Sequence, residues 1–200
     1  AHPADLTAIL DGNATFSATV NGTAPISYQW QKNGVNIAGA NAAAYMISPV
    51  KADSNGTYRV VAASPFGTAT SNGALLTVIL PPVITAQPAD VLVLATGTAT
   101  FDVNATAATG YQWQKVDANG TGTNIAGATS DTYTISNVAA NDAGQYRVSV
   151  SNAAGSVNSA MATLSLAYLP SIVSHPADLN ASTGSSVSFA VDANGTAPLS

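Results

Sequence analysis

The segment DANGTGTN, Asp117–Asn124, is the stretch of this sequence that most resembles a metal site. It begins Asp-x-Asn-Gly, which places the Asp117 carboxylate and the Asn119 side chain at alternate positions before a glycine. Calcium loops arrange oxygen ligands in this way around a glycine turn. The segment lacks a closing acidic ligand, and Asn-Gly is also a strong hairpin signal. We therefore interpret it as a lengthened hairpin loop, and we expect no metal and no cofactor.

The titratable residues do not form a catalytic set. His2 and His175 both precede a proline in the phrase HPAD, and the corresponding phrase QPAD has Gln87 at that position. A position that also accepts glutamine is a poor candidate for a general base. The ten acidic residues are all aspartates spread along the chain, and there is no cysteine. The paired carboxylates and thiols of common catalytic sites are therefore missing, and we expect no enzymatic activity.

An exposed aromatic residue in a loop would be a candidate contact for a glycan or a protein. Phe66 lies in the stretch SPFG, where a matching stretch further along the chain has Ala154. Phe66 could lie in a contact loop, and Asp117 and Asn119 could lie in a second contact loop. Alternatively, Phe66 packs on a neighbouring linker. We favour packing on the linker, because single exposed apolar residues are common.

The composition excludes several classes of protein. The net charge of -5 argues against a nucleic-acid partner, because nucleic acids select basic faces. No stretch is long and apolar enough to span a membrane, and the start lacks the pattern of a signal peptide. Charged residues are only 8% of the chain, against about 25% in ordinary soluble domains. We expect a polar surface of Thr, Ser, Asn and Gly, without direct membrane insertion.

The sequence repeats itself. HPAD, QPAD and HPAD recur along the chain, YQW and NIAGA each occur twice, and NGTYRVVAASPFGT matches AGQYRVSVSNAAGS. Phe16, Phe101 and Phe189 mark the same point in three copies, so that the period is 85 and then 88 residues. This period is that of one small domain for each copy. We predict domains at 1–80 and 81–168, and at 169–200 the start of a third, with its first two strands only.

Each copy has the pattern of short strands. Apolar residues alternate with polar ones around Phe16 and Phe101, and again around Tyr58 and Tyr146. Alternation with a period of two indicates strands with one buried face, as in antiparallel sheets. Asn-Gly and Gly-rich breaks separate these runs at the intervals of a sandwich, and no segment keeps a helical period. The sequence therefore predicts an all-β fold.

These residues resemble those of immunoglobulin-like domains, and most closely the cysteine-free, I-set-like repeats of large bacterial secreted or surface proteins. The resemblance implies Greek-key sandwiches, with Trp30 and Trp113 of YQW buried in the cores. NDAGQY resembles the motif of the tyrosine corner, which implies a backbone hydrogen bond from Tyr146 beside Asp142. In the first copy, DSNGTY places Tyr58 at the corner, but Ser54 stands where Asp142 stands, so that corner is less certain.

The family's disulfide is replaced by apolar residues. Where the resemblance would place cysteines, the first copy has Ala18 and Val60, and the second has Val103 and Val148. A disulfide in a small secreted domain contributes about 2–5 kcal/mol, part of which apolar burial can recover. We expect Ala18 to pack less fully, and the first domain to be the weaker one. The expected core residues besides the tryptophans are Phe16, Phe101, Phe189, Val60, Val103 and Val148.

The junctions between copies carry the functional prediction. ILPPVI and AYLPSI join the copies through Pro81, Pro82 and Pro170, without a flexible Gly/Ser run. Because proline favours extended backbone, such linkers hold neighbouring domains apart semi-rigidly. We predict a non-catalytic spacer, stalk or fibre segment of a large extracellular or cell-surface bacterial protein. We also read the chain as a piece of a longer array, cut within its third repeat.

The expected partners are neighbouring repeats of the same chain. Lateral self-association into fibres is also compatible with the sequence, because low charge opposes association only weakly. Two alternatives stay open. The first is an adhesin-type module that contacts a glycan or a protein through its loops, and the second is a set of accessory domains of a secreted hydrolase.

Overall fold

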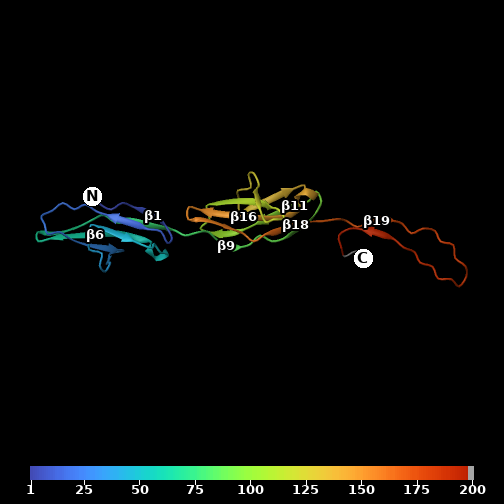
Figure 1. Ribbon diagram of the computed structural model, residues 1–200, viewed down its shortest axis with the longest axis horizontal. Helices are drawn as coiled ribbons and strands as arrows, with labels where there is room; N and C mark the ends of the chain where they lie inside the picture. The colour runs from blue at the N-terminus through green and yellow to red at the C-terminus, as the bar shows by residue number, and fades with distance from the viewer. Residues whose placement is uncertain (198–200) are drawn as a thin grey trace. The chain divides into compact units, whose positions relative to one another are not determined.

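The computed structural model describes residues 1–197. These residues form short β-strands and two single-turn 3-10 helices, η1 (Ala52–Ser54) and η2 (Ala140–Asp142) (Figure 1). The chain divides into two compact units. One contains Ala1–Val83, Ala105–Thr109 and Ser151–Val157, and the other contains Ile84–Asn104, Gly110–Val150 and the chain from Asn158 onward. No helix in the described residues has the length and apolar character needed to cross a membrane.

The first sandwich contains eight strands in two sheets. The larger sheet has the order β1-β8-β6-β3-β4, with β7 also paired to β6, and the smaller sheet pairs β2 with β5. Strand β1 runs parallel to β8, whereas the other pairs with a described register are antiparallel. The bounds are β1 Leu6–Ile9, β2 Ala14–Ser17, β3 Ser27–Lys32, β4 Val35–Asn36, β5 Ala44–Ile47, β6 Gly56–Ser64, β7 Gly67–Thr70 and β8 Ala74–Ile79.

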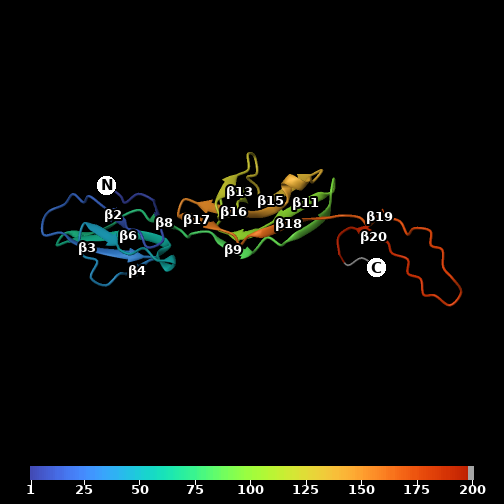
Figure 2. The same ribbon diagram turned by 45° about the vertical axis from the view of Figure 1, so that its right-hand side comes forward.

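The second sandwich repeats this topology. Its larger sheet has the order β10-β18-β16-β13-β14 with β17 paired to β16, and a smaller sheet pairs β11 with β15 (Figure 2). One further pair, β9 with β12, has no counterpart among the strands of the first sandwich. The bounds are β9 Val83–Ala86, β10 Val91–Leu94, β11 Thr98–Asp102, β12 Asn104–Thr106, β13 Gly110–Val116, β14 Gly122–Asn124, β15 Thr132–Ser136, β16 Gly144–Asn152, β17 Gly155–Asn158 and β18 Ala162–Ala167.

The alternating residues form the two cores. Tyr58, Val60 and Ala62 of β6 are buried, and so are Tyr146, Val148 and Val150 of β16, as the period of two predicts for strands with one face inward. Trp30, Phe16 and Val60 have at most 2% of their surface exposed, and the equivalent residues of the second sandwich are buried to the same degree. The predicted all-β fold of immunoglobulin-like sandwiches is confirmed.

The C-terminal segment differs from its prediction. It contains β19 (Ser171–Ser174) paired with β20 (Asp192–Asn194), but residues around Phe189 form no strand. The prediction that Phe189 is a core residue is wrong for the described structure, since 66% of its surface is exposed. The physical reason is that Phe16 and Phe101 each pack against a Trp and a Tyr ring, whereas no aromatic ring packs against Phe189 within the described residues.

Candidate functional site

An aromatic cluster joins the two sheets of each sandwich. In the second sandwich the Phe101 ring lies 5.9 Å from the Trp113 ring and 5.1 Å from the Tyr146 ring, and the Tyr133 ring lies 6.1 Å from each of the last two. Phe101 and Tyr133 come from the smaller sheet, and Trp113 and Tyr146 from the larger one. The first sandwich repeats the cluster with Phe16, Trp30, Tyr45 and Tyr58.

Each buried tryptophan also has a polar partner. Trp30 Nε1 donates to the Ala42 carbonyl at 2.9 Å, and Trp113 Nε1 donates to the Ser130 carbonyl at 3.0 Å. A buried indole N–H without such an acceptor would lose its hydration without compensation. The cluster is therefore apolar in its ring contacts and satisfied at its N–H groups, which makes it a structural site rather than a chemical one.

A tyrosine hydroxyl closes the corner of each sandwich. Tyr58 Oη donates to the Ser54 carbonyl at 2.8 Å, and Tyr146 Oη donates to the Asp142 carbonyl at 2.6 Å. Burial raises the pKa of Tyr58 and of Tyr146 to about 12, with smaller contributions from a neighbouring tyrosine and an aspartate. The neutral hydroxyl, which is the form that can donate to the carbonyl, is therefore favoured in the folded state.

The Ser54 corner works in the same way as the Asp142 corner. The Ser54 Oγ accepts from the Lys51 N–H at 3.0 Å, and the Asp142 Oδ2 accepts from the Ala139 N–H at 2.8 Å. Both side chains thus hold the amide that precedes the 3-10 turn. Since a hydroxyl and a carboxylate can both accept one hydrogen bond, the substitution of Ser for Asp preserves the turn.

The repeated HPAD phrase has a structural role in both sandwiches. His2 Nδ1 accepts from the Asn72 N–H at 3.1 Å, and at the corresponding position Gln87 Oε1 accepts from the Ala160 N–H at 2.8 Å. The aspartates of the phrase act similarly, because Asp5 accepts from the Leu75 N–H and Asp90 from the Thr163 N–H, both at 2.7 Å. Histidine and glutamine are thus alternative acceptors at one position.

The Asp117 loop is a hairpin turn between β13 and β14. Asp117 Oδ1 accepts from the N–H groups of Asn119 and Thr121 at 2.9 and 2.8 Å, and Gly120 has a φ of +82°. The carboxylate is thus engaged by its own loop, as is usual for Asp in turns. Within residues 1–197 no group of three His or Asp side chains is arranged to hold a metal ion.

A groove lined by both polar and apolar residues lies on the first unit. It consists of two adjoining hollows of about 340 and 220 Å³, which share Val20, Asn21, Ala62 and Ala69. Phe66 lines one end of the groove. Phe66 has 81% of its surface exposed in the described residues, and its packing on a neighbouring linker stays a prediction. This groove is the candidate binding site of the chain.

Sequence reasoning found Phe66 but missed the rest of the groove. Val20, Ile26 and Ala69 are small or medium apolar residues, and their pattern does not differ from that of core positions in neighbouring strands. The signal that could have revealed them is the comparison between copies, since Ala154 stands where Phe66 stands. The linker residues Pro81 and Pro170 are exposed, whereas Pro82 is buried.

Comparisons with known proteins agree with this architecture. The profile of the immunoglobulin domain family matches residues 81–152. The I-band fragment I67–I69 of titin superposes with a TM-score of 0.71 and 22% identity, covering 98% of this chain and 75% of the titin chain. At this identity the likeness concerns the fold alone. The fold is thus that of tandem immunoglobulin-like sandwiches, and the sequence contains no cysteine.

Two curated relatives share parts of the sequence. Endoglucanase C of Cellulomonas fimi is 38% identical over 117 residues, which is 57% of this chain and 10% of the enzyme. The human leucine-rich repeats and immunoglobulin-like domains protein 1 is 28% identical over 212 aligned residues, which is 92% of this chain and 19% of that protein. The chain thus spans a tenth to a fifth of the length of these relatives.

The hydrogen bond from Tyr146 to the Asp142 carbonyl should contribute measurably to the free energy of unfolding. We expect Tyr146→Phe to lower the free energy of unfolding of the second sandwich by about 1–2 kcal/mol, because the Asp142 carbonyl loses its donor. Urea denaturation in a Trp30→Phe background measures this, since Trp113 fluorescence then reports the second sandwich alone. Tyr111→Phe, at a half-buried position of β13, is the matched control. Equal losses for both variants would contradict the corner assignment.

The raised tyrosine pKa values predict a loss of stability at high pH. The folded state keeps the Tyr58 and Tyr146 protons between the ordinary pKa of 10.0 and about 12, where an unfolded chain loses them. Stability is therefore complete below pH 10.0 and falls as the pH rises towards 12. Urea midpoints across this range measure the effect. A Tyr58→Phe, Tyr146→Phe double variant should show a smaller fall, and an unchanged fall would contradict this explanation.

Proposed function

We propose that the chain is a spacer segment of a large secreted or cell-surface bacterial protein, in which immunoglobulin-like sandwiches set the distance between other parts. The observation that carries the proposal is that each sandwich contains its own aromatic cluster and tyrosine corner. A sandwich with its own complete core stays folded, and so keeps its dimensions, without a bound ligand. The bacterial relative supports the proposed bacterial origin.

The linkers support the same role. Pro81, Pro82 and Pro170 restrict the backbone between the repeats to extended conformations. Asn152 Nδ2 donates to the carbonyl of Leu80, directly before the first two prolines, and also to the carbonyl of Ala107. A linker that is restricted by proline, and whose carbonyl accepts a hydrogen bond, keeps a more constant end-to-end distance than a flexible Gly/Ser linker.

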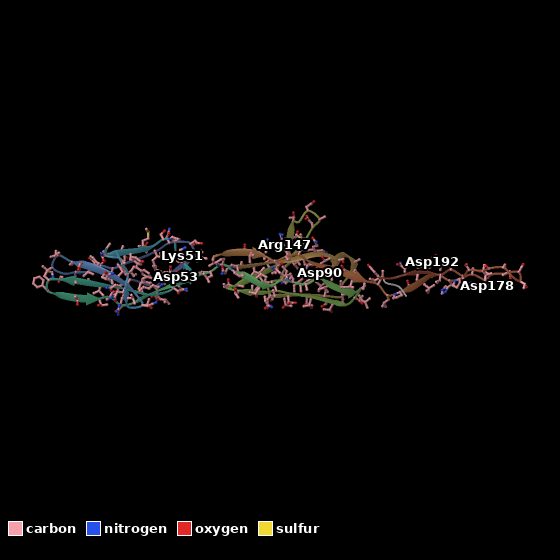
Figure 3. All side chains as sticks on the ribbon, turned by 90° about the horizontal axis from the view of Figure 1, so that it is seen from below. Lys51, Asp53, Asp90, Arg147, Asp178 and Asp192 are labelled. Atoms are coloured by element: carbon pink, nitrogen blue, oxygen red, sulfur yellow. The ribbon has the colours of Figure 1, made fainter. Side chains whose placement is uncertain are left out.

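The small number of charged residues suits a segment that is exposed to varying ionic strength. The charged residues labelled in Figure 3 are spread over both sandwiches and the C-terminal segment, and the whole chain has only five Lys and Arg and ten Asp. Interactions between so few exposed charges are weak and screened by salt, so that ionic strength should alter the segment little. The same low charge leaves lateral association of such segments into fibres open.

The endoglucanase relative favours a second candidate function. Its 38% identity covers 117 residues, and its name describes a hydrolase of glucans. In this second proposal the sandwiches are accessory domains of a secreted hydrolase, and they either position its catalytic part or contact its substrate. Saturable binding of the 200-residue chain to glucan that is lost on Phe66→Ala would favour a binding role over spacing.

Single-molecule force extension tests the spacer proposal. We expect two separate unfolding events, each releasing roughly 250–280 Å of chain, since some 80 residues extend at about 3.4 Å each. Trp113→Ala should remove or weaken one event and leave the other, because each core depends on its own tryptophan. A chain that extends without distinct events, or as one cooperative event, would contradict the proposed role.

A further inference from the structure

The charges of each sandwich are separated by sheet. In the strands of the first larger sheet the charged residues are Lys32 and Arg59. In the strands of the second larger sheet they are Lys115 and Arg147. All ten aspartates lie outside these strands, although the chain as a whole has a net charge of -5. The strands of the larger sheets thus carry positive charge alone, which is the sign that attracts an anionic ligand.

Neutral amides hold the arginine of the second sandwich in place. Arg147, labelled in Figure 3, donates from Nε to Gln114 Oε1 at 2.8 Å, and Gln114 Nε2 donates to Asn124 Oδ1 at 2.8 Å. We call these three side chains, which come from β16, β13 and β14, the arginine row. Within residues 1–197 the Nη groups of Arg147 form no hydrogen bond. Because its partner is neutral and its Nη groups are free, the guanidinium can donate two parallel hydrogen bonds to a carboxylate.

A glycine gives the row its room. Gly122 does not have a positive φ, so that its backbone conformation does not require glycine. A Cβ at this position would lie 2.7 Å from Arg147 Nη2 and closer still to Gln114 Oε1. A side chain here would therefore displace the guanidinium from its place over β14.

Polar side chains flank the row on the same face of the sheet. Gln145 and Ser149 lie two residues before and after Arg147 in β16, and alternate residues of a strand share a face. The first copy has Thr57 and Val61 at these two positions. The second sandwich therefore has the more polar surroundings.

The first sandwich contains an equivalent row. Arg59 Nε donates to Gln31 Oε1 at 2.7 Å, and Gln31 Nε2 donates to Asn36 Oδ1 at 2.8 Å. Arg59 is exposed, whereas Arg147 is half-buried. Since exposed charges are more strongly screened by solvent and salt, the row of the second sandwich is the better anion site.

The backbone around the row is already paired. Strand β16 pairs with β13, β17 and β18, and β13 pairs with β16 and β14. A peptide therefore cannot be added as a strand at this place, and recognition has to use side chains. The guanidinium suits a carboxylate, and the amide and hydroxyl groups beside it suit sugar hydroxyls. A polymer that has both groups is an acidic polysaccharide, such as a chain of uronic acids.

We propose that the arginine row binds a carboxylate of an acidic polysaccharide, and that Gln145 and Ser149 form hydrogen bonds with its hydroxyl groups. The row of the first sandwich is a second, weaker site of the same kind. This function involves neither the Phe66 groove nor a neutral glucan, and it is independent of the proposed spacing role.

The test is an NMR titration of the 200-residue chain with trigalacturonate. Saturable shifts should be largest at the Nε–H of Arg147 and the side-chain amide of Gln114. The neutral trisaccharide of galactose should bind at least about tenfold more weakly, because it lacks the carboxylate that forms the charged hydrogen bonds. Absence of saturable shifts with trigalacturonate, or equal binding of both trisaccharides, would overturn the proposal.

Variants separate the row from a general effect of charge, with binding followed at Gln114. Arg147→Gln should weaken binding at least about tenfold. Lys51→Gln removes the same charge at an exposed position outside the strands, and as the matched control it should bind as the parent does. Gly122→Ala keeps the charge, and it should weaken binding by a smaller factor because its Cβ displaces the guanidinium.

Tryptophan fluorescence verifies that the three variants are folded. Equal weakening by Arg147→Gln and Lys51→Gln would overturn the location of the site. Unchanged binding by Gly122→Ala would overturn the geometry proposed for the row.

An acidic peptide and a second copy of the chain are the competing occupants. Triglutamate has carboxylates without sugar hydroxyls, so that it should bind more weakly than trigalacturonate. Equal or tighter binding of triglutamate would overturn a polysaccharide as the ligand. Without ligand, the Nε–H signal of Arg147 should not change with protein concentration. A change would indicate that aspartates of a second copy occupy the row, and it would overturn a separate ligand.

Discussion

Each sandwich depends on one contact, in which a phenylalanine of the smaller sheet stacks on the tyrosine of the corner. Phe16 and Tyr58 lie 4.8 Å apart between ring centroids, and Phe101 and Tyr146 lie 5.1 Å apart. Each pair joins a strand of the smaller sheet to a strand of the larger sheet, and the tryptophan packs beside it. The chain has no cysteine, and this aromatic contact joins the sheets two residues before the positions, Ala18 with Val60 and Val103 with Val148, to which the resemblance assigns a disulfide.

Apolar residues complete the space around the aromatic pair. In the second sandwich Val103 and Val148 are at most 2% exposed, whereas in the first sandwich Ala18 is 9% exposed opposite Val60 at 2%. Backbone acceptors then satisfy the polar ends of the cluster, namely the indole N–H groups and the tyrosine hydroxyls. Lys32 and Lys115 each donate to a carbonyl of the 3-10 turn and lie about 6 Å from the corner tyrosine ring. Ring packing and hydrogen bonds to backbone carbonyls thus stabilise each core in a chain that has no cysteine.

The fold could be predicted from the sequence because its signals are local and repeated. Alternation around Phe16 and Phe101 indicates strands, and a second copy of each motif confirms the period without any other information. Phe189 has the same local signal, but it is exposed, because burial also requires residues that are distant in the sequence. Alternation therefore predicts which residues prefer a core, and their burial depends in addition on the strands that pack against them.

The candidate site was less predictable for a similar reason. The groove is lined by residues of two segments, 20–26 and 62–69, that are distant in the sequence, so no local pattern marks it. Phe66 was recognised because its copy, Ala154, is small, but its surroundings could be seen only in three dimensions. Likewise, Ser54 carries no motif signal, yet its hydroxyl performs the task of a carboxylate at the corner.

Amide hydrogen exchange of the 200-residue chain tests the central claim most directly. If the aromatic clusters organise two self-contained sandwiches, the slowest amides should be those of the strands that carry Trp30, Tyr58, Trp113 and Tyr146. Residues 187–191, which have the same alternation but no cluster, should exchange quickly. Protection of residues 187–191 equal to that of Trp113 would contradict the account, because alternation alone would then be enough to form a stable core.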